Sequence, residues 1–120
     1  MFKIALQLQE NLLRLNDQVT QFTVLQFEGK LKKRIEQLIT KVTTFFYEIS
    51  EAIENLKWGK ITDLILQLLS DIEKFLLDFY NRFSLPYEKE LVANTKNIIA
   101  AIKQQVAFLD QKRQSYLVFE

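Results

Sequence analysis

Apolar residues recur along the chain at intervals that alternate between three and four positions. The pattern is most regular between residues 30 and 57, at the positions Leu31, Ile35, Leu38, Val42, Phe45, Ile49, Ala52 and Leu56. This spacing places the apolar side chains on one side of an α-helix, as in helices that pack lengthwise against one another. We therefore predict a long helix that belongs to a helical bundle.

Three further segments follow the same spacing. The residues in phase are Ala5, Leu8, Leu12, Leu15, Val19 and Phe22; Ile61, Ile65, Leu68, Ile72, Phe75 and Phe79; and Val92, Thr95, Ile99, Ile102, Val106, Leu109 and Tyr116. Gly29, Gly59 and Pro86 separate the segments, since glycine favours the position just past a helix end and proline is accommodated in a first turn. The predicted all-α helices span approximately 2–28, 30–57, 61–84 and 86–117. Because the connections are short, these helices form an antiparallel up-down-up-down four-helix bundle, in a single domain of residues 1–120.

Both ends of the chain also fit a different local structure. Residues 2–9 largely alternate between apolar and other side chains, and residues 19–27 are rich in threonine, valine and phenylalanine. Both features favour strands. The apolar C-terminus is similarly ambiguous, so the pattern leaves short extended segments open within residues 1–27 and 114–120.

Composition narrows the possible chemistry. The chain has no cysteine and no histidine, which excludes the common zinc sites, cysteine nucleophiles and Ser-His-Asp triads. Its net charge of +1 gives no general attraction to nucleic acids or anionic membranes. The most apolar stretch, residues 61–80, is too charged to span a membrane, since it contains Asp63, Asp71, Glu73, Lys74 and Asp78. No secretory signal is evident, and a cytoplasmic location is predicted.

A carboxylate motif offers one route to enzymatic chemistry. Residues 48–51, Glu48-Ile49-Ser50-Glu51, have the spacing Glu-x-x-Glu. In this motif the chain resembles the all-helical nucleotide pyrophosphohydrolases of the MazG and dimeric dUTPase type, which hold magnesium with such a pair. Those proteins add a Glu-x-x-Asp pair on the next helix, whereas here no acidic pair with that spacing is present among Asp71, Glu73 and Asp78. Glu51 and Glu54 also point away from the apolar seam. No catalytic residue, metal site or cofactor is predicted.

Four basic residues open the second helix: Lys30, Lys32, Lys33 and Arg34. Cations in a first helical turn oppose the helix dipole, which invites a functional explanation. Contact with a nucleic-acid backbone is one explanation. A solvated helix end beside the C-terminus of the first helix is the other.

The third helix carries more apolar residues than a helix on the outside of a bundle requires. Surplus apolar surface is typical of an interface. The predicted interface residues are Leu66, Leu69, Leu76, Leu77, Tyr80 and Phe83. A second contact surface is predicted on the first helix, from its uncharged polar residues Gln7, Gln9, Asn11, Asn16, Gln18, Thr20, Gln21 and Thr23.

These features favour a non-enzymatic assembly or adaptor subunit that acts through protein–protein contacts or self-association. The alternative is a small subunit of a nucleoprotein complex that touches a nucleic-acid backbone; in size and helicity the chain is similar to the small helical subunits of CRISPR effector complexes. A magnesium-dependent pyrophosphohydrolase-like enzyme ranks third. No small-molecule substrate is identified.

Overall fold

The computed structural model describes the backbone of residues 2–55 and 57–118, with side chains for residues 6–55 and 57–111. Its elements are α1 (Phe2–Thr20), the 3-10 helix η1 (Gln21–Leu25), α2 (Gly29–Glu54), α3 (Trp58–Asp78), the 3-10 helix η2 (Tyr80–Arg82) and α4 (Pro86–Val118). The predicted all-α fold is confirmed. Within those ranges there is no strand, so the extended alternative for residues 2–25 and 114–118 is wrong.

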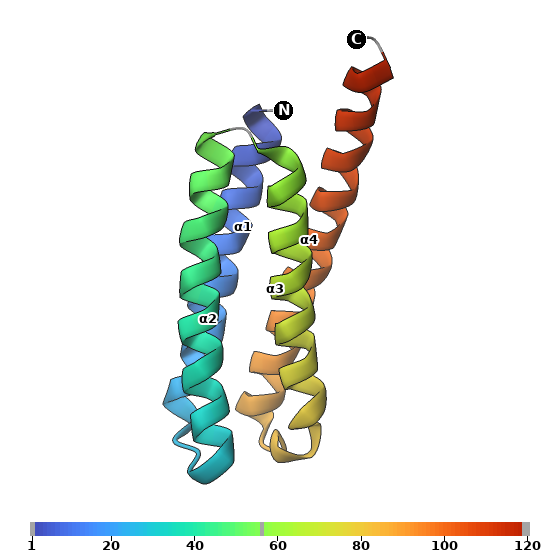
Figure 1. The fold of residues 1–120 in the computed structure, drawn as a ribbon. Helices are drawn as coiled ribbons and strands as arrows, with labels where there is room; N and C mark the ends of the chain where they lie inside the picture. Colours follow the sequence, from blue (N-terminus) through green and yellow to red (C-terminus); the bar gives the residue numbers. More distant parts are fainter. Residues whose placement is uncertain (1, 56, 119–120) are drawn as a thin grey trace.

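The helices form an elongated bundle with dimensions of 54 × 22 × 20 Å (Figure 1). Each helix packs against the next one along the chain, and α4 returns to pack against α1, which confirms the up-down-up-down arrangement. At 33 residues, α4 is longer than the other helices, and its C-terminal end extends past them. The pair α3 and α4 packs less closely than the other neighbouring pairs.

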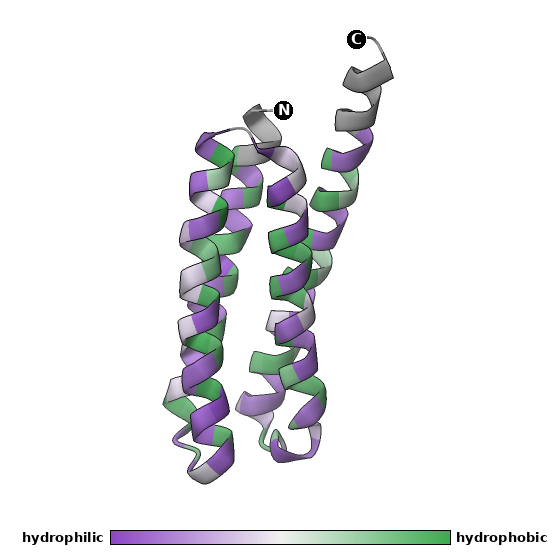
Figure 2. Cartoon of the chain, in the orientation of Figure 1, coloured by the Kyte–Doolittle hydropathy of each residue, from purple (hydrophilic) through white to green (hydrophobic). Residues whose placement is uncertain are grey.

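Hydrophobic and hydrophilic residues share every helix (Figure 2), and the apolar sides meet in one core. Most of the in-phase positions are buried, while Phe45, Phe79 and Val92 are half-buried. Thr95 is also buried in this core, and its hydroxyl is satisfied because it donates a hydrogen bond to the carbonyl of Leu91 at 2.8 Å. The predicted core side chains Ala5, Leu56 and Tyr116 lie outside the described ones.

The helix ends differ from their predicted positions. The α-helical part of the first segment stops at Thr20, and a 3-10 helix follows. The Thr20 and Thr23 hydroxyls each donate to a backbone carbonyl at 2.8 Å, and such local bonds compete with regular helix geometry. Gln26 then ends the segment in the left-handed conformation, with φ 54° and ψ 38°.

The boundary between the second and third helices is not at Gly59, where it was predicted. That residue lies in the first turn of α3, which begins at Trp58. Asn55 ends α2 instead, because both its backbone N–H and its side-chain amide donate to the carbonyl of Glu51, at 3.1 and 2.9 Å. An asparagine side chain that bonds the last turn is an alternative to glycine as a helix stop.

The N-terminus of α4 lies at Pro86, as predicted. The buried carboxylate of Glu88 accepts the backbone N–H groups of Ser84 and Leu85, at 3.1 and 2.9 Å. A glutamate at this position of the first turn completes half of a capping box and meets the positive end of the helix dipole. These interactions explain how a carboxylate is buried at this end of the bundle.

The α1–α2 connection allows a direct test of backbone conformation. Gly29 has φ +69° with nothing within 4 Å of an added Cβ, while Gln26 occupies the same region without being glycine. Gly29→Ala is expected to destabilise the protein by about 1 kcal/mol, and Gln26→Gly to stabilise it by about 0.5–1 kcal/mol. Urea denaturation measures both. Equal effects of the same sign would contradict the assigned backbone.

Candidate functional site

The six predicted interface residues divide into two groups. Leu66, Leu77 and Tyr80 are exposed, with 46%, 76% and 65% of their surfaces accessible, as the prediction requires. The other three are buried in the bundle core, with exposures of 1%, 3% and 5% for Leu69, Leu76 and Phe83. These three side chains therefore belong to the bundle core, and they are not the exposed interface residues that the prediction requires.

The burial of Leu69, Leu76 and Phe83 has a geometric cause. The apolar stripe of α3 is broad because the helix faces α2 on one side and α4 on the other, so residues one step off the seam are also covered. Phe83 lies beyond the end of α3, and the short helix η2 returns it to the core. There its ring packs against those of Phe22 and Phe75 at centroid distances of 5.5 and 6.0 Å.

A groove of about 860 Å³ runs along the surface between α3 and α4. Its floor includes the buried side chains of Leu76 and Ile99. A second hollow of about 500 Å³ continues it toward the α3–α4 connection and shares Tyr80 and Lys96 with it. We call the two together the α3–α4 groove. Its lining residues are Leu66, Ser70, Glu73, Lys74, Leu76, Leu77, Tyr80, Asn81, Phe83, Ser84, Lys89, Val92, Ala93, Lys96, Ile99, Ala100 and Lys103.

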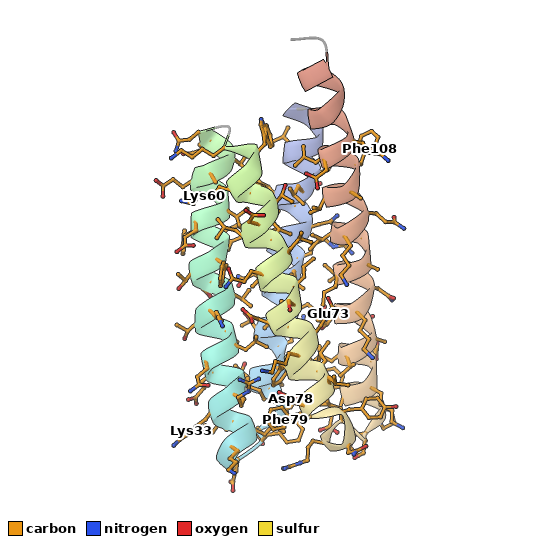
Figure 3. The ribbon with its side chains drawn as sticks, turned by 45° about the vertical axis from the view of Figure 1, so that its right-hand side comes forward. Lys33, Lys60, Glu73, Asp78, Phe79 and Phe108 are labelled. Atoms are coloured by element: carbon orange, nitrogen blue, oxygen red, sulfur yellow. The ribbon has the colours of Figure 1, made fainter. Side chains whose placement is uncertain are left out.

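The α3–α4 groove is positively charged. Four lysines and one glutamate line it, which gives a net charge of 4 − 1 = +3. Glu73, which Figure 3 shows beside α4, pairs with Lys103 at 2.8 Å, and the Lys96 ammonium lies 6.0 Å from the centre of the Tyr80 ring. Within the described part of the chain, Lys74 and Lys89 have no carboxylate partner. The surplus positive charge is thus open to solvent or to a ligand.

The α4 side of this groove was not among the predicted site residues. Lys89, Lys96 and Lys103 recur every seventh residue, and Ala93 and Ala100 show the same interval between them. Residues seven apart lie on one side of a helix, so the lysine row was a readable signal. The pattern did not show which residues would lie across from these lysines. Only the packing of α4 against α3 places the row on the same groove as Leu66 and Leu77.

The predicted basic patch is only partly free. Lys30, Lys32 and Lys33 are exposed in the first turns of α2, whereas the Arg34 guanidinium lies 3.5 Å from the Asp78 carboxylate on α3. Acidic residues also lie among these lysines: Glu28 and Glu36 line the same hollow as Lys32. The patch therefore combines both charge signs, and contact with a nucleic-acid backbone stays a hypothesis.

The predicted contact surface on α1 is not continuous. At 100° per residue, Gln7, Asn11 and Gln18 fall on one flank of the buried seam and the remaining polar residues fall mainly on the other. The Asn11 amide donates to the Gln105 side chain of α4 at 3.0 Å, so part of the first flank is used inside the bundle.

The carboxylates of the magnesium hypothesis do not converge. Glu48, Glu51 and Glu54 are exposed on α2. On α3, Asp71, Glu73 and Asp78 are each close to a cation, at 3.1 Å from Lys41, 2.8 Å from Lys103 and 3.5 Å from Arg34. Among the side chains that the structure describes, no three or more of Asp, Glu, His or Cys are grouped so as to hold a metal ion.

The molecule is thus an all-α protein of the four-helix-bundle class, with an apolar and positively charged groove between its third and fourth helices. No protein-family model matches the chain, and no curated protein or solved structure is significantly similar to it. Over the described residues, none of the helices combines the length and the apolar character needed to cross a membrane.

Proposed function

We propose that this chain is a non-enzymatic assembly or adaptor subunit that acts through protein–protein contacts at the α3–α4 groove. The observation that carries the proposal is the grouping of Leu66, Leu77 and Tyr80 along one lip of that groove. Single exposed apolar residues are common on protein surfaces, whereas apolar groups gathered around a hollow with a polar rim are typical of interaction sites.

The energetics favour a partner. Full burial of a leucine side chain contributes about 1.5–3 kcal/mol, and Leu77 keeps most of its surface in water in the isolated chain. A partner that covers Leu66, Leu77 and Tyr80 would recover this free energy. The polar groups around them are mainly lysines, which can pair with the acidic groups of a partner. This chemistry suits recognition of a partner.

The double substitution Leu66→Gln/Leu77→Gln tests the proposal. The variant should keep the melting temperature of the wild type within a few degrees, because both side chains are exposed, but it should lose its partner or its self-association. Native mass spectrometry of the purified chain and quantitative affinity capture from cell extract measure the two kinds of association. The control is Leu6→Gln/Leu13→Gln on α1, whose leucines are also exposed, at 46% and 49%.

Other outcomes would favour the other functions. If the double variant and its control retain the same binding, the groove is not the contact surface and the proposal is wrong. Binding of single-stranded oligonucleotides that weakens when Lys30, Lys32 and Lys33 are replaced by glutamine would favour the nucleoprotein subunit. Release of pyrophosphate from nucleoside triphosphates with Mg²⁺ would favour the enzyme.

A further inference from the structure

We propose that the α3–α4 groove binds one amphipathic α-helix whose apolar stripe is flanked by acidic residues, supplied by a protein partner. This inference rests on the proposed function and adds the structure and the charge of the ligand. Three properties of the groove support it: its walls, its length and the arrangement of its lysines.

The walls of the groove select for a helical ligand. Along the part of the groove that contains Leu66 and Leu77, both walls are α-helices, whose backbone N–H and C=O groups are already bonded within the helix, so this part offers no sheet edge to an extended peptide. A helical ligand satisfies its own backbone and needs only side-chain contacts. The small side chains of Ser70 and Ala100 line the same groove, which leaves room for another helix to approach.

The length of the groove matches a short helix. Leu66 and Leu77 are 11 residues apart on α3, which corresponds to about 16 Å along the helix axis. Apolar residues at positions i, i+4, i+7 and i+11 of a ligand helix cover the same distance. At the end near the N-terminus of α3, the Thr62 hydroxyl donates to the Asp110 carboxylate at 3.3 Å and holds the two helices together. A ligand helix of about 15–18 residues therefore fits.

The lysines determine the charge of the ligand. Lys89, Lys96 and Lys103 form a row along α4 at intervals of about 10.5 Å, and Lys74 lies on the opposite lip. Only Lys103 is paired with a carboxylate of the groove, Glu73. Acidic residues spaced by seven on one flank of the ligand meet the α4 row, and an acidic residue on its other flank meets Lys74. Such complementarity favours acidic helices and disfavours basic ones.

Fluorescence anisotropy with a synthetic helix tests the inference. The probe is a labelled 18-residue peptide with leucines at the four stripe positions and glutamates on both flanks; its controls carry lysine or glutamine in place of every glutamate. We expect saturable binding of the acidic peptide that weakens with added salt, and no binding of the basic peptide.

Substitutions in the protein locate the site. Lys89→Glu/Lys96→Glu and Leu77→Gln should each weaken binding of the acidic peptide by about tenfold or more, with helicity unchanged in circular dichroism. The control variant Lys33→Glu, on α2, should bind as the wild type does. Amide chemical-shift changes on peptide addition should concentrate on α3 and α4.

Several results would overturn the inference: equal binding of the acidic and basic peptides, unchanged binding by the two groove variants, shift changes away from α3 and α4, or displacement of the peptide by a single-stranded oligonucleotide. Failure of the inference can be distinguished from failure of the proposed function. If the peptide does not bind while Leu66→Gln/Leu77→Gln still abolishes natural association, a different protein occupies the groove, such as a second copy of this chain. If that double variant changes nothing, both proposals are wrong.

Discussion

Replacing Phe75 by alanine is expected to lower the free energy of unfolding by about 3–5 kcal/mol. Phe75 is buried near the C-terminal end of α3, and its ring contacts three others. The centroid distances are 5.7 Å to Phe22, 5.5 Å to Phe79 and 6.0 Å to Phe83. Such aromatic pairs contribute about 0.5–1.5 kcal/mol beyond the burial of their surface.

Truncation at Phe75 removes these contacts and leaves a cavity that the neighbouring rings cannot fill without leaving their own positions. Equilibrium denaturation in urea measures the loss. Tyr47→Ala is the control, because Tyr47 is exposed on α2, and its effect should stay within about 0.5 kcal/mol. If Phe75→Ala costs less than about 1 kcal/mol, the aromatic cluster is not packed as described.

Leu69→Ala is expected to cost about 2–5 kcal/mol, and Leu77→Ala no more than about 0.5 kcal/mol. Both leucines lie on α3, eight residues apart, and both were predicted to be interface residues. Leu69 is buried between the helices, whereas Leu77 projects from the lip of the α3–α4 groove. The same urea experiment compares the two, with circular dichroism to confirm that helicity is retained. Similar losses at both positions would place Leu77 in the core and remove the exposed lip on which the proposed function depends.

The repeat of apolar residues was sufficient to predict the four helices and most of the core. Burial in a bundle follows helical phase, and phase depends only on position along the chain, as for Ile35 in α2 or Ile102 in α4, which are both buried. The predicted helix ends were less accurate, because they depend on competing hydrogen bonds. At Asn55 a side-chain amide takes the role that had been assigned to Gly59, and at Thr20 the hydroxyl bonds a backbone carbonyl.

The sequence was sufficient to predict features on each side of the α3–α4 groove, but not that the two sides face each other. Helical phase correctly placed Leu66 and Leu77 off the seam of α3, and the sevenfold interval of Lys89, Lys96 and Lys103 was visible in the sequence. Neither pattern identified the other as its neighbour, since the two segments belong to different helices. Their meeting across one groove is a tertiary contact, and it is the basis of both proposals.

The sequence by itself determined which side of each helix is apolar, because the 3.6-residue period is a local property of the backbone. Only the tertiary structure decided how much of that side is covered, because coverage depends on the spacing between helices. Close packing of the bundle around α3 buries Leu69 and Leu76, and the looser packing between α3 and α4 leaves Leu66 and Leu77 exposed. That spacing depends on side chains contributed by all the helices at once, so no single segment of the sequence contains it.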